Sequence, residues 1–287
     1  MKPQCNICGH QGEFLNPVPG SEGWHCSNCS SSSRHRMLMF VLGSLLGLND
    51  LPLYLWPQNK NQKILEPCAR GPQALFLKEK FDFYAPEFDL EKIKTGADPR
   101  KYADLQALAF EDETFDIIIA SEVFEHVRED VKGFREVYRT LKTGGTFLLT
   151  VPYDHQREKT NVFVKVDGDQ DIYLVPPRYH GGGGSTLAYR EYGRDLLGLL
   201  NSLGFAVGYI EPALPCFQIY KSKIMICQKS SYLDLGNIYS SENASGSVFR
   251  PLGPLWLFRL FVLFKYNLKS LFHFFREVKR KITCFCP

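Results

Sequence analysis

The sequence has no apolar run long enough to cross a bilayer, and no apolar stretch behind Met1 of the kind that a secretory signal needs. Near the C-terminus, Arg259 and Lys265 interrupt the apolar runs well short of the roughly 18 to 20 residues of a membrane span. The composition is also not that of a disordered protein, because 44% of the residues are hydrophobic and 23% are charged. We therefore expect a globular protein of the cytoplasm.

A basic excess is missing from most of the chain. The formal net charge is +3, but residues 251–287 carry seven Lys or Arg and one Glu, or +6, which leaves −3 for the rest. The body therefore lacks the basic surface on which nucleic-acid binding depends, so nucleic acid is the less favoured partner.

Cysteine is present in a pattern. Cys5 and Cys8, then Cys26 and Cys29, form two C-x-x-C knuckles separated by 17 residues. In a reducing compartment two knuckles favour one tetrahedral Zn²⁺ over disulfides. The alternative, a redox pair, requires a thioredoxin-like context and no second knuckle. We predict a zinc-ribbon-like module over residues 1–36 in which all four cysteines bind structural zinc.

Two apolar runs joined by a helical pattern indicate the larger domain. The first run starts at Phe115 and ends in the polar pair Ser121 and Glu122. An amphipathic stretch and a glycine turn follow, and then a second apolar run ends at Pro152. Each run has the length and continuity of a strand in a parallel sheet covered on both faces. In such α/β sheets, ligands bind beyond the carboxyl ends of the strands.

These segments resemble class I S-adenosylmethionine (SAM) dependent methyltransferases. The FD-hydrophobic strand before Glu125-His126, and the LKxGG turn at 141–145, are similar to the fourth to sixth motifs of that family. The resemblance runs from Lys63 to Lys229 and is nearest to bacterial small-molecule and glycan-modifying enzymes, the type 11-like group. It implies a Rossmann-like, doubly wound sheet of seven strands over residues 61–229, with its last strand antiparallel.

The remaining segments are assigned around this domain. We expect a connecting helix and linker over 37–60, a Ser/Asn/Gly-rich linker over 230–250 and a basic amphipathic helix over 251–287. Inside the domain the patterns predict strands at 63–67, 81–84, 205–210 and 219–228, a third edge element near 104, and helices at 73–80 and 192–203.

The resemblance also implies which residues bind the cofactor. Only Gly71 remains of the family's glycine-rich loop, in which missing side chains let the backbone approach SAM. Glu87, with Asp89 as the competing acid, follows the second strand and would accept the ribose hydroxyls. The full implied set is Glu66, Gly71, Glu87, Asp104, Leu105, Ser121 and Glu122.

Candidate catalytic residues lie on the expected acceptor side. His126 titrates near neutrality and could act as a general base, although a structural role at the start of a helix is the competing interpretation. Tyr179 and His180 belong to a PPxYHG segment that the family shares, followed by glycines that suit a lid over an acceptor pocket.

The C-terminal segment predicts a surface helix. Its basic residues recur every three or four positions opposite Leu and Phe, a pattern typical of binding to an anionic membrane. Docking on the protein's own core or on a partner is the alternative.

The sequence as a whole predicts methyl transfer from SAM to an O or N acceptor on a glycan, a lipid-linked intermediate or a small metabolite. The alternatives are an RNA methyltransferase that grips RNA with its zinc module and a non-catalytic scaffold that kept the fold. We expect a cytoplasmic protein that binds the inner face of the membrane through residues 251–287. The sequence does not specify its oligomeric state.

Overall fold

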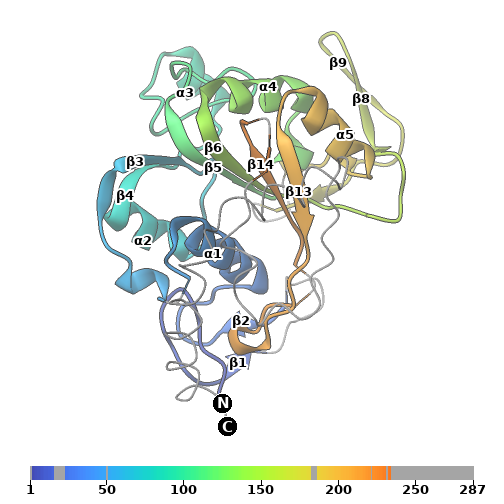
Figure 1. Ribbon diagram of the computed structural model, residues 1–287. Coiled ribbons are helices and arrows are strands. Elements are labelled where there is room, and N and C mark those ends of the chain that lie inside the picture. The colour runs from blue at the N-terminus through green and yellow to red at the C-terminus, as the bar shows by residue number, and fades with distance from the viewer. Residues whose placement is uncertain are drawn as a thin grey trace. The chain divides into compact units, whose positions relative to one another are not determined.

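A mixed six-stranded sheet forms the centre of the fold in the computed structural model, which describes residues 2–15, 23–49, 51–181, 186–220, 222–230 and 232–233 (Figure 1). The strands, in spatial order, are β13 (Ala206–Ile210), β14 (Ile224–Gln228), β6 (Leu141–Thr150), β5 (Phe115–Ser121), β3 (Asn59–Leu65) and β4 (Phe81–Tyr84). Strands β4, β3, β5 and β6 run parallel, whereas β14 lies antiparallel between β6 and β13. The expected α/β architecture with an antiparallel last strand is confirmed.

The seventh strand does not form among the described residues. The segment before Asp104 contributes one parallel bridge, between Glu87 and Tyr102. The Lys101 and Tyr102 N–H groups both donate to the Asp98 carbonyl, so this segment turns on itself and cannot extend a ladder. The expected third edge element is therefore reduced to a single pair of residues.

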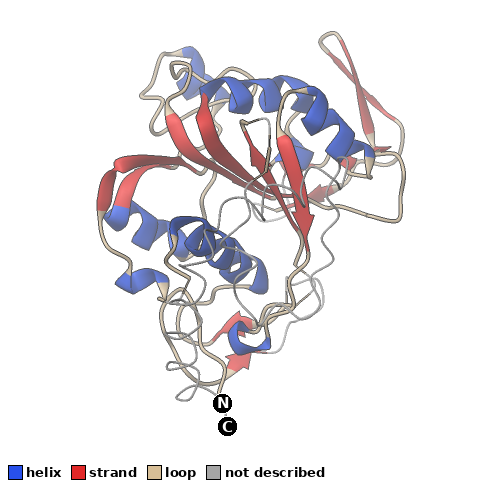
Figure 2. Cartoon of the chain, viewed as in Figure 1, coloured by secondary structure: helices blue, strands red, loops and turns tan. Residues whose placement is uncertain are grey.

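Helices cover both faces of the sheet (Figure 2). One face packs against α1 (Ser33–Leu46) and α2 (Gln73–Lys80), and the other against α4 (Asp130–Thr140) and α5 (Asp195–Ser202). Strand β5 shows why: Ile117 and Ile119 belong to the first cluster of buried residues, and Ile118 to the second. Because side chains alternate along a strand, one continuous apolar run supplies both cores.

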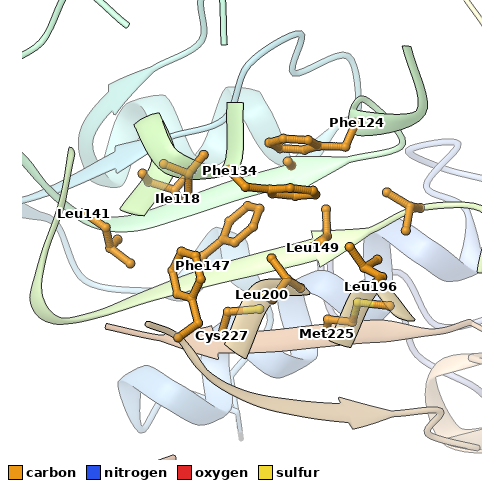
Figure 3. Packing of buried hydrophobic residues seen from close by; sticks show 14 of the residues in the cluster. Ile118, Phe124, Phe134, Leu141, Phe147, Leu149, Leu196, Leu200, Met225 and Cys227 are labelled. Carbon is orange, nitrogen blue, oxygen red and sulfur yellow. The ribbon is translucent and has the colours of Figure 1, made fainter. Parts of the chain in front are cut away.

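The core under α4 and α5 is built around stacked aromatic rings (Figure 3). Phe124 and Phe134 are fully buried and stack with centroids 4.0 Å apart, and Phe147 packs edge-on against Phe124. Leu196 and Leu200 of α5 lie in the same cluster. This packing fixes the turn η2 (Phe124–His126) that follows β5.

Helix α1 begins at Ser33, four residues before the expected start. Ser32 caps it, because its hydroxyl accepts from the His35 N–H while the His35 ring accepts from the Ser32 N–H. Arg34 and Arg36, which fall in the predicted module over residues 1–36, therefore lie in the first turn of the helix.

Arg36 joins the cysteine module to the rest of the fold. Its fully buried guanidinium donates to the carbonyls of Trp24 (2.7 Å), Phe217 (2.7 Å) and Gln218 (2.9 Å). Within the module, β1 (Phe14–Leu15) pairs antiparallel with β2 (His25–Cys26). Outside the module, the turn η3 (Pro215–Phe217) follows β13. A short helix, α3 (Leu90–Lys94), follows Asp89, and η1 (Leu53–Leu55) precedes β3.

An insertion between β6 and α5 forms three short antiparallel pairs. They are β8 (Val164–Asp167) with β9 (Gln170–Tyr173), β7 (Asn161–Val162) with β12 (Arg190–Glu191), and β10 (Tyr179–His180) with β11 (Thr186–Leu187). Helix α5 starts at Asp195 and not at the expected Tyr192, because the Tyr192 backbone pairs with the strand-like segment at Tyr153.

No helix within the described ranges is long and apolar enough to span a membrane. The expected linker over 230–250 lies almost entirely outside those ranges, and the expected amphipathic helix over 251–287 lies wholly outside them.

Candidate functional site

Glu66 follows β3 at the carboxyl edge of the sheet. Its side chain is fully buried, and its Oε1 accepts a hydrogen bond from Gln73 Nε2 at 2.9 Å. Its Oε2 has no hydrogen-bond partner among the described residues. Burial raises the pKa of Glu66 to about 7, against the bond from Gln73 and the charge of Arg34, which both lower it. A buried carboxyl group with a raised pKa, one oxygen of which has no partner among the described residues, therefore lies where the resemblance places SAM.

The loop after Glu66 compensates for its lost glycines. Cys68 adopts a φ of 55°, the left-handed conformation that glycine adopts most easily. There is no room for a side chain at position 71, because a Cβ added to Gly71 would lie 2.0 Å from Gln73 Oε1. The Gln73 side chain thus crosses Gly71 to reach Glu66, a contact that sequence reasoning missed.

Glu122 and Arg34 form an ion pair beside Glu66. The Arg34 Nη1 and Glu122 Oε1 atoms are 3.4 Å apart, and both side chains are largely buried. Glu122 has a φ of 53°, which turns the chain sharply after β5, and Thr150 Oγ1 donates to Ser121 Oγ at 3.3 Å. The structure therefore brings Glu66, Ser121 and Glu122 to one edge and adds Arg34 from the N-terminal region.

The two competing acids beyond β4 have different surroundings. Asp89 caps α3, because its Oδ1 accepts from the Glu91 and Lys92 N–H groups at 3.1 Å. Glu87 is exposed, and its backbone pairs with Lys101 and Ala103. The structure thus gives Asp89 a structural role, and the assignment of Glu87 to ribose stays a prediction.

Asp104 and Leu105 are held by their own loop. The Asp104 carboxylate accepts from the Gln106 backbone N–H at 2.8 Å, and Leu105 is buried in the core under α4 and α5. The Gln106 Oε1 in turn accepts from the Glu129 N–H at 2.9 Å. This chain of contacts fixes the loop beside the start of α4, and the adenine-binding role of Asp104 stays a prediction.

Glu125, His126 and His180 form a compact cluster. Glu125 Oε1 lies 3.6 Å from His126 Nε2 and 3.7 Å from His180 Nε2, and the two imidazole rings are 4.6 Å apart. Glu125 is fully buried, whereas the His180 side chain is about half exposed. The sequence predicted both histidines as site residues but not Glu125, because the Glu125-His126 pair was interpreted as the start of a helix.

The insertion holds this cluster in place. The His126 Nδ1 atom is 2.8 Å from the Leu187 carbonyl, the Tyr189 N–H donates to the Glu125 carbonyl, and Arg190 donates to the carbonyls of Val127 and Arg128. Burial lowers the pKa of His126, and the nearby His180 lowers it further, while the contact with Leu187 raises it. Tyr179, the third candidate, is 54% exposed and lies outside the cluster.

The four module cysteines lie together as a separate cluster. Their sulfur atoms all lie within 4.8 Å of one another, with Cys5 3.7 Å from Cys29 and Cys8 3.7 Å from Cys26. Four sulfurs at 2.3 Å from a tetrahedral zinc would be about 3.8 Å apart, so the donor set fits that ion. A hydrogen bond from Cys29 lowers the pKa of Cys5.

A groove of about 650 Å³ lies between α4, α5 and the insertion. Its lining residues include Arg128, Lys132, Lys165 and Tyr192, and none of the predicted site residues. The groove is therefore separate from the carboxyl-edge cluster around Glu66 and from the histidine cluster.

Residues 71–149 match the family model described as a methyltransferase domain. Phosphoethanolamine N-methyltransferase 2 of Caenorhabditis elegans is 33% identical over 81 residues, which are 26% of this chain and 18% of that protein. The chain thus spans less than one fifth of this curated relative. The matched segment contains β4, β5, α4 and most of β6, so this part of the chain is similar to methyltransferase domains.

Two solved structures are more distantly similar. The 1,6-didemethyltoxoflavin-N1-methyltransferase of Burkholderia thailandensis is 17% identical with a TM-score of 0.38, over 67% of this chain and 76% of that one. Phosphoethanolamine N-methyltransferase 2 of Haemonchus contortus is 14% identical with a TM-score of 0.35, over 66% of this chain and 53% of that one.

Proposed function

We propose that this methyltransferase domain transfers a methyl group from SAM to an O or N acceptor on a glycan, a lipid-linked intermediate or a small metabolite. The single observation that carries the proposal is Glu66, a buried carboxyl group at the end of β3 with one oxygen unpartnered among the described residues. A buried carboxylate favours a cationic neighbour, and SAM has an ammonium group at its amino-acid end.

The surrounding side chains fit the same end of the cofactor. Arg34 supplies a guanidinium group for the carboxylate of SAM, and Glu122 holds that guanidinium in place. Beyond β4, the exposed Glu87 is available for ribose hydroxyls, while Asp89 is occupied at α3. SAM, when bound, supplies a sulfonium methyl group that a nucleophile displaces in line, giving S-adenosylhomocysteine.

The chain would contribute mainly alignment. Holding an acceptor in line with the methyl group can supply much of the acceleration, and a base is needed only when the nucleophile must lose a proton. His126 and His180 belong to the loops beyond β5 and β6, where an acceptor would approach, and they are the residues that we expect to contact it.

Two further assignments belong to this proposal. The four module cysteines would hold one structural Zn²⁺, supported by the spacing of their sulfur atoms. Residues 251–287 would bind an anionic membrane surface, supported by their charge of +6 and their apolar face.

Calorimetric titration with SAM tests the function. Glu87→Ala should weaken SAM binding by roughly tenfold or more, because a carboxylate that accepts ribose hydroxyls contributes about 1.5 to 3 kcal/mol. Asp89→Ala is the matched control and should leave SAM binding within about twofold, since Asp89 is committed to capping α3. The reverse pattern would show that the ribose acid is Asp89, and absence of SAM binding by the wild-type chain would refute the proposed function.

A further inference from the structure

The geometry points to a second metal site, formed by Glu125, His126 and His180. We propose that these three side chains bind one divalent transition-metal ion, separate from the four-cysteine cluster. The ligand atoms are one carboxylate oxygen and two imidazole nitrogens, which all lie within 4.8 Å of one another.

The distances suit such an ion. At metal–ligand distances of about 2.0 to 2.2 Å, two ligand atoms on a tetrahedral ion lie about 3.3 to 3.6 Å apart. The observed separations from Glu125 Oε1 are 3.6 Å to His126 Nε2 and 3.7 Å to His180 Nε2. The carboxylate oxygen therefore lies within a few tenths of an ångström of the ligand separation on either side, and the two imidazole ligand atoms lie within 4.8 Å of each other.

The orientation of His126 is set for coordination. A carbonyl oxygen can only accept a hydrogen bond, so the 2.8 Å contact with Leu187 requires the proton of His126 on Nδ1. Nε2 of a neutral His126 then carries a lone pair, and this atom lies 3.6 Å from Glu125 Oε1. Metal-binding histidines usually donate their other ring N–H to a carboxylate, a backbone carbonyl or water, and the contact with Leu187 is one of these arrangements.

The cluster combines a carboxylate of a fully buried residue with two imidazole rings, and this donor set can hold a cation. His180 lies in β10, which pairs with β11, and β11 carries the Leu187 carbonyl that contacts His126. One hairpin thus supplies both a ligand and the group that orients another ligand.

The donor set selects the class of ion. Two imidazoles and one carboxylate are typical of Zn²⁺, Co²⁺ or Fe²⁺, whereas Mg²⁺ and Ca²⁺ prefer oxygen ligands only. Three protein ligands leave coordination positions open, and the half-exposed His180 places them near solvent. That an acceptor oxygen fills such a position rests on the proposed function; the binding of the metal does not.

Titration of the full-length chain with Co²⁺ tests the proposal by binding alone. The wild-type chain should bind one equivalent of Co²⁺ more than His180→Ala, and this difference does not depend on whether the cysteine cluster is filled. His155→Ala, the removal of an exposed histidine outside the cluster, is the control and should bind as many equivalents as the wild type. A large excess of Mg²⁺ should not displace the additional ion.

The visible spectrum adds a second readout. The additional Co²⁺ should give ligand-field bands without the thiolate charge-transfer absorption that the cysteine cluster would produce. His126→Ala should lose the same bands while keeping the wild-type circular dichroism spectrum. Equal Co²⁺ uptake by the wild type and His180→Ala would overturn the proposal and leave a proton shared between Glu125 and an imidazole, whether or not SAM binds.

Discussion

At the residue scale, the burial of Glu66 makes its ionisation costly to the folded state. Its pKa lies at about 7 against an ordinary value of 4.5, because burial disfavours the ionised form. Between these pH values the folded chain holds more protons than the unfolded chain, so the free energy of unfolding falls as pH rises through the window. The cost is fully present above about pH 7, where an ammonium group bound beside Glu66 would offset it.

We predict that Glu66→Gln abolishes this pH dependence. The wild type should lose up to about 3 kcal/mol of unfolding free energy between about pH 5 and pH 8 relative to the variant, since each pKa unit corresponds to 1.36 kcal/mol. Urea unfolding at several pH values measures it. Glu158→Gln, at an exposed position, should follow the wild type. Parallel curves for the wild type and Glu66→Gln would show that Glu66 ionises normally.

At the scale of elements, one arginine links the N-terminal module to the rest of the fold. The two strands of the module have two residues each, so they supply little stability of their own. Buried Arg36 links the module to η3 and places a positive charge beside the four thiols. A zinc ion bound by four thiolates carries a formal charge of −2, and Arg36 would partly balance it.

We predict that the double change Cys5→Ser and Cys8→Ser removes one equivalent of zinc and destabilises the chain. The loss should amount to several kcal/mol, because structural zinc contributes directly to folding. Elemental analysis and thermal unfolding measure the two effects. Cys216→Ser changes an exposed cysteine outside the cluster and should keep both zinc and stability. Unchanged zinc content in the double variant would refute the assignment.

The elements differ in how far the sequence predicts them. Helix α2 and strand β4 have the predicted bounds, because their signals are local apolar and turn patterns. Helix α1 starts earlier than predicted, because His35 takes the place that Glu or Gln usually has in a capping box. The seventh strand was predicted from a family pattern, and a turn at Asp98 prevents it.

The residues of the candidate site could also be predicted only in part, because some of them meet over long distances in the sequence. Glu66 and Glu122 directly follow β3 and β5, so their positions could be predicted from the strands themselves. Arg34 reaches Glu122 from 88 positions earlier in the chain, and His180 reaches Glu125 from 55 positions later. Such contacts depend on how the N-terminal helix and the insertion pack, which no local pattern encodes.

At the scale of the whole molecule, charge divides the chain into two parts. Residues 251–287 carry +6 and the rest carries −3, so the two parts should respond oppositely to an anionic surface. Within 251–287 the basic residues Lys265, Lys269, Arg276 and Arg280 recur at helical spacing, opposite Leu and Phe. The body alone should be repelled by such a surface, so any binding must come from this segment.

We predict that the full chain floats with liposomes that contain acidic lipid. Each basic residue near an anionic leaflet contributes about 1 kcal/mol, and the burial of the apolar face adds to it, so binding should be reversible and weaken with salt. Deletion of 251–287 should abolish flotation, and neutral liposomes serve as the lipid control. Replacing Lys265, Lys269, Arg276 and Arg280 with Gln keeps the apolar face, so the loss of flotation in that variant would separate charge from hydrophobic insertion. Equal flotation by the deleted chain would show that this segment packs elsewhere.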